Sequence, residues 1–232
     1  RPRPRPMQRP PRSTQLLGAA ALVTALVTAL VGGCSLDPVQ SGSIKALGDE
    51  DPNIPRGEYH RQGQPCVLCH STTGPASDKP FAVAGTVFVG PFSARGAGNT
   101  WVRVVDAKGT QVCKTTNCKG NFFFRDEDFT PNGQFQEKPG PSFPLLVSIQ
   151  RSLPGNPVGA NRAMSSHIGR EGSCSACHKP PPDAKSVASF DTPGVVRLYD
   201  TEASGDQALP PSTEACPPAA PEQLVPCPEN PP

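Results

Sequence analysis

Two copies of the pentapeptide Cys-x-x-Cys-His constrain this chain more than any other feature of its sequence. They span 66–70 and 174–178. Two thiols at this spacing can each bond one vinyl group of a haem, and the His that follows then lies beneath the iron as an axial ligand. The chain has only nine Cys and four His, so two copies indicate a shared chemical role. The sequence therefore predicts two c-type haems, covalently attached through Cys66, Cys69, Cys174 and Cys177.

The histidine count matches this prediction. Two irons with two axial ligands each need four imidazoles, and the chain has four His. We expect His70 and His178, inside the motifs, to be the proximal ligands. His60 and His167 each lie shortly before a motif, and we expect them to be the distal ligands. Met164 is the alternative sulfur ligand for the second haem.

Two other chemistries use similar patterns. Cys pairs with nearby His also bind zinc, but the two pairs lie much farther apart in sequence than the halves of a zinc ribbon. A Cys-x-x-Cys redox site needs a βαβ context, which the sequence around neither motif indicates. Haem attachment is the favoured prediction, and zinc is its main alternative.

The N-terminal segment predicts export from the cytoplasm. Residues 1–33 contain five Arg and no acidic residue, and an apolar stretch begins at Leu16. This is the pattern of a secretory signal peptide. The alternative, a membrane-spanning helix, would be short for a bilayer. The small residues Gly32 and Gly33 before Cys34 resemble a bacterial lipobox, which implies a lipidated Cys34 and a protein anchored in the cell envelope, on the periplasmic side or in the outer membrane.

The remaining cysteines predict disulfides. Haem attachment and lipidation account for five Cys, and an even number remains. In an oxidising compartment the simplest arrangement is two local bridges between neighbours in sequence. We therefore expect Cys113 to pair with Cys118 and Cys216 with Cys227, as structural links without chemistry of their own.

The composition favours a loop-rich chain with one modest folded region. The chain contains 31 Pro and 22 Gly, which disfavour long helices. In order, we expect a signal peptide (1–33), a flexible lipid-anchored linker (34–59), a first haem-binding segment (60–79), a β-sandwich (80–150), a second haem-binding segment (151–179) and a Pro-rich C-terminal tail (180–232).

Short β-rich runs between the two motifs predict β-strands. The runs are Phe81–Val89 and Trp101–Val105, in which apolar residues alternate, and Gln111–Thr115, Phe122–Arg125 and Leu145–Gln150. Short strands cut by Gly and Pro turns are typical of a small antiparallel sandwich. We expect Phe122, Phe123 and Phe124 to be core residues. In the tail, Gly194–Tyr199 is the one further strand-like run. The predicted fold class is mainly β, a small antiparallel β-sandwich flanked by loop-rich c-type haem-binding segments, with disordered Pro-rich termini.

The segment also resembles the carboxypeptidase regulatory-like, transthyretin-type β-sandwich. The residues that carry the resemblance are Ala84-Gly85-Thr86-Val87, Val102-x-Val104, Asp106-x-x-Gly109, Thr115 and Gly120-Asn121-Phe122-x-Phe124. In that family the module is commonly a folding or interaction unit without catalytic residues. The segment 80–150 contains no His, so we expect no haem ligand in it.

The exported portion as a whole resembles bacterial multihaem c-type cytochromes, specifically a small dihaem lipoprotein. The resemblance implies an electron carrier rather than an enzyme, with redox proteins of the envelope as partners and the lipid at Cys34 as membrane contact. A dihaem peroxidase-like enzyme and a haem-based sensor or binding lipoprotein are the alternatives. The chain has 22 Lys and Arg against 20 Asp and Glu, and without the five Arg of 1–33, 17 basic side chains remain. This balance does not indicate nucleic acid binding.

Overall fold

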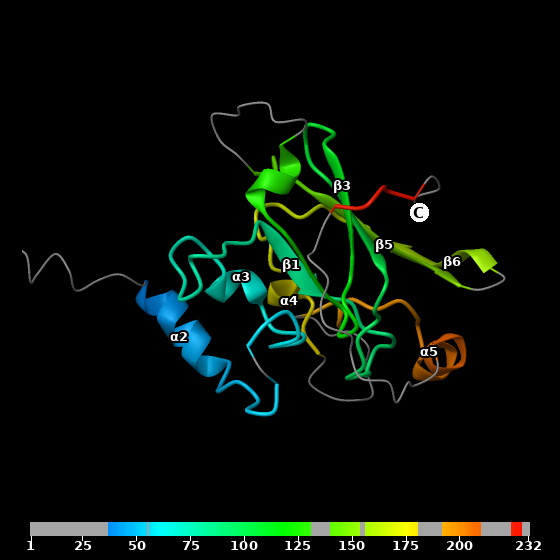
Figure 1. The fold of residues 1–232 in the computed structure, drawn as a ribbon, viewed down its shortest axis with the longest axis horizontal. Helices are drawn as coiled ribbons and strands as arrows, with labels where there is room; N and C mark the ends of the chain where they lie inside the picture. The colour runs from blue at the N-terminus through cyan, green and yellow to red at the C-terminus, as the bar shows by residue number, and fades with distance from the viewer. Residues whose placement is uncertain are drawn as a thin grey trace, which may run out of the picture.

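Two antiparallel sheets form the body of the protein (Figure 1). The computed structural model describes residues 37–54, 56–130, 140–153, 156–180, 192–209 and 224–228. Within them, six strands and a few short helices make up the regular structure, so the predicted mainly β class is confirmed. The predicted signal peptide, Cys34 at the start of the predicted linker, and much of the predicted tail, including Cys216, lie outside the described residues.

The larger sheet has four strands in the order β3–β2–β5–β6. These strands are β3 (Gln111–Thr115), β2 (Trp101–Val105), β5 (Leu146–Leu153) and β6 (Asn156–Ala163). Along β2, Val102 and Val104 are fully buried while their neighbours are partly exposed, which is the alternation that predicted this strand. Asp106 closes the β2–β3 hairpin, because its carboxylate accepts hydrogen bonds from the backbone of Lys108 and Thr110.

The smaller sheet pairs β1 (Val83–Thr86) with β4 (Asn121–Phe124). All four residues of β1 are buried. In β4, Phe122 and Phe124 join the hydrophobic core, whereas Phe123 points to the opposite face. The prediction that all three rings are core residues is therefore correct for two of them. A short 3₁₀ helix, η1 (Asp126–Phe129), follows β4 and contributes Phe129 to the core.

One hydrophobic core draws side chains from both sheets. It contains Val83 from β1, Phe122 and Phe124 from β4, and Val104 and Ile149 from β2 and β5. Burial of this apolar surface is the main stabilising contribution to a fold of this size.

Residues 196–199, within the strand-like run predicted in the tail, pair with 88–89. Three elements lie in segments for which the sequence predicted loops, a linker or a tail. They are the strand β6 in the predicted second haem-binding segment, the helix α2 (Pro38–Ala46) in the predicted linker and the helix α5 (Glu202–Ala208) in the predicted tail. All three are polar and lack an apolar period. They form because β6 extends a β5 hairpin by backbone bonds and because Asp37 and Thr201 cap the two helices.

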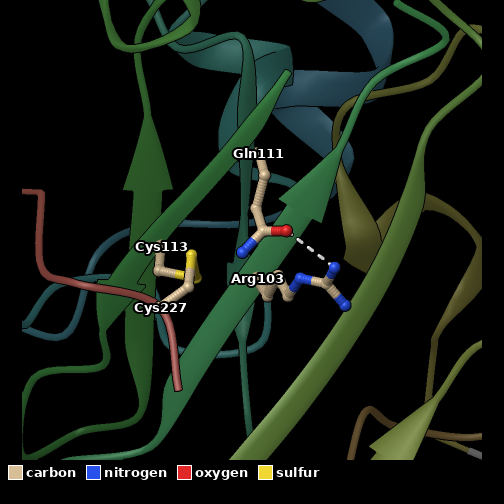
Figure 2. Close-up of a disulfide and its surroundings, with 4 residues drawn as sticks. All are labelled: Arg103, Gln111, Cys113 and Cys227. Atoms are coloured by element: carbon tan, nitrogen blue, oxygen red, sulfur yellow. Dashed lines mark hydrogen bonds between the residues drawn. A yellow bond between two sulfur atoms is a disulfide. The ribbon is translucent and has the colours of Figure 1, made fainter. Parts of the chain in front are cut away.

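The tail is fixed to the sheet by a disulfide that the sequence did not predict. Cys113 in β3 is bonded to Cys227, 114 residues away in sequence (Figure 2). The predicted pairs Cys113–Cys118 and Cys216–Cys227 are therefore wrong. Cys118 is also disulfide-bonded. Residues 224–228 run along the free edge of β3, where the Val225 N–H donates to the Cys113 carbonyl at 2.9 Å. Cys227 lies two residues after Val225, and residues two apart in an extended chain point to the same face.

We predict that Cys227→Ser lowers the free energy of unfolding by about 2–5 kcal/mol. The disulfide closes a loop of more than a hundred residues, so its loss gives the unfolded chain a large conformational freedom. Chemical denaturation followed by tryptophan fluorescence measures the change, since Trp101 lies in β2.

A peptide map checks the pairing itself. Digestion of the non-reduced protein with trypsin and a glutamate-specific protease should release residues 109–114 linked to the peptide that contains Cys227. Recovery of residues 109–114 linked to residues 115–119 would instead support the local pairing of Cys113 with Cys118.

Candidate haem sites

The two Cys-x-x-Cys-His motifs adopt the same local structure. The helix α3 (Cys66–Cys69) and the helix α4 (Cys174–Cys177) are each a single turn that ends at the motif His. In both, the His N–H donates to the carbonyl of the first Cys, at 2.9 Å in α3 and 2.8 Å in α4. One helical turn separates these two residues, so the first thiol and the imidazole emerge from the same side of the turn.

Each motif His uses one ring nitrogen on a backbone carbonyl. The Nδ1 atom of His70 donates to the Lys79 carbonyl at 2.8 Å, and that of His178 to the Gly194 carbonyl at 2.9 Å. A carbonyl can only accept, so Nδ1 carries the proton and Nε2 keeps its lone pair. Metal-bound His side chains are held in this way. Burial lowers the pKa of both imidazoles and favours the neutral form that binds iron.

The structure places the ring of His60 near that of His70. Their ring centroids lie 6.0 Å apart and their planes are inclined at 44°. His60 also directs Nδ1 to a backbone carbonyl, that of Gly57. An imidazole nitrogen lies about 2.0 Å from a metal, so two imidazoles on opposite sides of one metal have centroids roughly 6 Å apart. The pair thus fits two axial ligands of one haem iron.

Aromatic stacking fixes the plane of the His70 ring. Phe81 lies parallel to it, with 4.0 Å between centroids and 11° between planes, and Phe123 stacks on the other face of Phe81 at 4.2 Å. The buried Lys114 lies over Phe123, with Nζ 5.2 Å from the ring centroid. Sequence reasoning missed Phe81 and Phe123 as site residues, because the apolar runs that contain them predicted only strands.

The helix α2 also contacts the first motif. Gln40 Nε2 donates to the Leu68 carbonyl and to Ser71 Oγ, both at 2.8 Å, and Gln40 Oε1 accepts from Thr73 Oγ1 at 3.1 Å. The expected flexible linker therefore contains a helix that is docked on the first motif. Its sequence signal is the pair Asp37-Pro38, an N-cap followed by a Pro at the first helical position.

The second motif lies against β1. Ala84 pairs with Ser173 directly before α4, and its N–H donates to the Gly172 carbonyl at 2.9 Å. Cys174 faces Gly85, where an added Cβ would lie 2.7 Å from Cys174 Cβ. Burial raises the pKa of the Cys174 thiol to about 12, with a further contribution from nearby Cys66. The two motifs are therefore neighbours, and Figure 1 shows α3 and α4 side by side at β1.

The structure does not bring His167 to the second motif as it brings His60 to the first. His167 is exposed in the loop after β6, and within the described residues it makes no ring contact. Met164, the alternative ligand, packs against the hydrophobic core. Of the predicted distal ligands, His60 alone has the geometry expected of one in this structure.

Comparison of this chain with protein-family models, curated protein sequences and solved structures finds no match. In the described part of the chain, no group of three or more His, Cys, Asp or Glu is arranged to hold a metal ion. A haem iron needs only two protein ligands, so a pair such as His60 and His70 falls outside that criterion. None of the helices in the described ranges has the length and apolar character to span a bilayer.

We predict that Cys174 resists alkylation in the folded, haem-free protein. The thiolate is the nucleophile, and a pKa of about 12 makes it about a thousandfold rarer at pH 8 than in an unperturbed Cys. Timed iodoacetamide labelling with mass spectrometry should modify the exposed Cys177 about 10²–10³ times faster. Labelling of Cys174 should rise about tenfold for each pH step from 8 to 10, as its thiolate fraction does.

Unfolded protein in urea is the control, because both thiols are then hydrated and should react at similar rates. Equal labelling of Cys174 and Cys177 at pH 8 in the folded protein would contradict the prediction.

Proposed function

We propose that this chain is a dihaem c-type cytochrome that carries single electrons at the bacterial cell envelope. The observation that carries the proposal is the His60–His70 pair, with ring centroids 6.0 Å apart and with Nδ1 of each ring on a backbone carbonyl. With Nδ1 bonded to a carbonyl, the Nε2 lone pair of each ring would be the one to bind a metal. A bound haem would supply an iron that alternates between the ferric and ferrous states.

The protein side chains would supply covalent attachment and iron ligands, and would exclude other ligands. The thiols of Cys66 and Cys69 would attach the first haem, and those of Cys174 and Cys177 the second. An iron held by two imidazoles has no open position, so its coordination changes little on reduction. That property suits electron transfer better than catalysis on a substrate.

The adjacency of the two motifs supports electron exchange between them. Both α3 and α4 lie at β1, and Cys66 influences the pKa of Cys174. Covalent attachment at these cysteines would therefore hold the two haems next to one another. The described segment between the motifs would be their scaffold.

The scaffold is proposed to be a transthyretin-type β-sandwich. Two antiparallel sheets that share one hydrophobic core support this assignment. In this proposal the exported chain is anchored by a lipid at Cys34, on the periplasmic side or in the outer membrane, and exchanges electrons with redox proteins of the envelope. The helix α2 begins at Pro38, so the anchor would lie close to the first haem.

A second candidate function is favoured by the position of His167. Because His167 is exposed and Met164 packs in the core, the second iron would have His178 as its protein ligand and a position for an external molecule. This arrangement is typical of a haem-based sensor or of a peroxidase-like enzyme.

Optical spectra of the exported protein separate the two functions. For electron transfer we expect a pyridine haemochrome count of two covalent haems per chain, both low-spin and both unchanged by carbon monoxide. Absence of covalent haem would refute the proposal, and zinc binding by the motif Cys and His would then be the favoured alternative. One carbon-monoxide-reactive haem in the wild type would favour the sensor or enzyme.

Two matched variants assign the distal ligands. His60→Ala should make the first haem high-spin and reactive to carbon monoxide, because it removes the imidazole opposite His70. If His167 ligates the second iron, His167→Ala should do the same there. A low-spin first haem in His60→Ala would remove His60 from the ligand set.

We also predict that Gly85→Ala selectively blocks attachment of the second haem. The added Cβ would lie 2.7 Å from Cys174 Cβ and 3.0 Å from Cys174 Sγ, which forces α4 away from β1. Mass spectrometry of the exported variant should find haem mainly on the peptide with Cys66 and Cys69. Gly169→Ala is the matched control, since nothing lies within 4 Å of its added Cβ. Full occupancy of both sites in Gly85→Ala would contradict this expectation.

A further inference from the structure

The segment that carries His60 is held against the sheets by side chains that lie outside both motifs. We define residues 57–63 as the distal loop. Asn121, the first residue of β4, directs its side-chain amide at this loop, and Nδ2 lies 3.1 Å from the Glu58 carbonyl and 3.4 Å from the His60 carbonyl. The carbonyl of the candidate distal ligand is thus held by a strand that is far from it in sequence.

A second connection reaches the end of the distal loop. The Gly63 N–H donates to Thr86 Oγ1 at 2.8 Å, and the Thr86 hydroxyl donates to Asn121 Oδ1 at 2.7 Å. Both the amide oxygen and the amide nitrogen of the Asn121 side chain are therefore hydrogen-bonded. Thr86 is 2 % exposed, so this connection is shielded from water.

The neighbouring Asn117 reinforces the same contact. Its Nδ2 donates to the Glu58 carbonyl at 2.8 Å, and its Oδ1 accepts from the backbone N–H of Asn121 at 3.0 Å. The turn that leads into β4 and the strand itself thus hold the distal loop together.

The distal loop needs such restraint because its backbone is strained. Arg61, next to His60, has φ of +50°, a region that residues other than Gly seldom adopt, and Gly63 has φ of +76°. Without external hydrogen bonds a loop of this kind would populate other conformations, and the His60 ring would face His70 for a smaller fraction of the time.

We propose that Asn121 is a positioning residue for the distal ligand of the first haem, acting with Thr86 on the distal loop. This inference rests on the proposed function and extends it, since it gives the β1–β4 sheet a role in ligation. Preorganisation of His60 raises its effective affinity for the iron and so excludes external ligands from the sixth position.

The test compares Asn121→Asp with Asn161→Asp in the full-length exported protein. The first variant keeps the oxygen that accepts from Thr86 but replaces the N–H donor with an oxygen. The second makes the same change, with the same added charge, at an exposed position of β6. In the reduced protein, carbon monoxide binding at the first haem should increase about tenfold or more in Asn121→Asp, as expected from the loss of one or two net hydrogen bonds. It should be unchanged in Asn161→Asp.

Added imidazole distinguishes positioning from general destabilisation. If Asn121 acts by orienting His60, external imidazole should take the sixth position of the first haem in Asn121→Asp and lower its carbon monoxide binding, and His60→Ala should show the same behaviour. Thr86→Val is the second variant, because it removes the hydroxyl with no change of charge. It should also increase carbon monoxide binding, and it keeps the test decisive if Asn121→Asp does not fold.

The outcomes separate this inference from the function on which it rests. Wild-type protein without covalent haem would overturn both. Wild-type protein with two low-spin haems, together with unchanged carbon monoxide binding in Asn121→Asp or, if that variant does not fold, in Thr86→Val, would overturn the inference and leave the proposed function standing.

Discussion

The burial of β1 is the constraint on which the rest of the structure depends. All four of its residues are inaccessible to solvent, and the strand pairs with β4 on one side and contacts Ser173, directly before α4, on the other. The Thr86 hydroxyl at its end accepts from the distal loop. The helices α3 and α4 both contact this buried strand, and close packing against it fixes where each motif lies. The two candidate haem sites are therefore coupled through a single short strand.

The strands β1 and β2 were predictable because apolar residues alternate along their sequences, and β3, β4 and β5 because each is a short β-rich run next to turn residues. The strand β6 and the helices α2 and α5 were not, because their stability comes from backbone pairing, capping and docking rather than from an apolar face. The sequence did not predict the Cys113–Cys227 disulfide either. Sequence proximity favours local pairs, whereas the actual pair depends on where the tail meets the edge of β3.

The residues of the candidate site also fall into those that the sequence predicted and those that only the structure reveals. The spacing of thiols and imidazole within each motif is local, so the sequence alone predicts the residues for attachment. A count of ligands predicted four axial His, but it left open which distal His belongs to which haem, because the pairing depends on contacts between distant segments. Phe81 and Asn121 carry no chemistry of their own, so only their position against His70 and the distal loop reveals a role.

Charges of both signs surround each motif, and within the proposed function they would contribute to the potential of each bound haem. Burial is the larger cause of the lowered pKa of His178, and Arg197 adds to it, while the exposed Asp200 is 3.9 Å from that guanidinium. Near the first motif, Asp78 and Lys79 act on the pKa of the proximal His in opposite directions, and Arg61 and Glu50 do so on the pKa of the Cys69 thiol. A fixed positive charge disfavours the ferric state, which carries one more charge than the ferrous state, and a fixed negative charge favours it. Each motif therefore combines charges that would act on the iron in opposite directions.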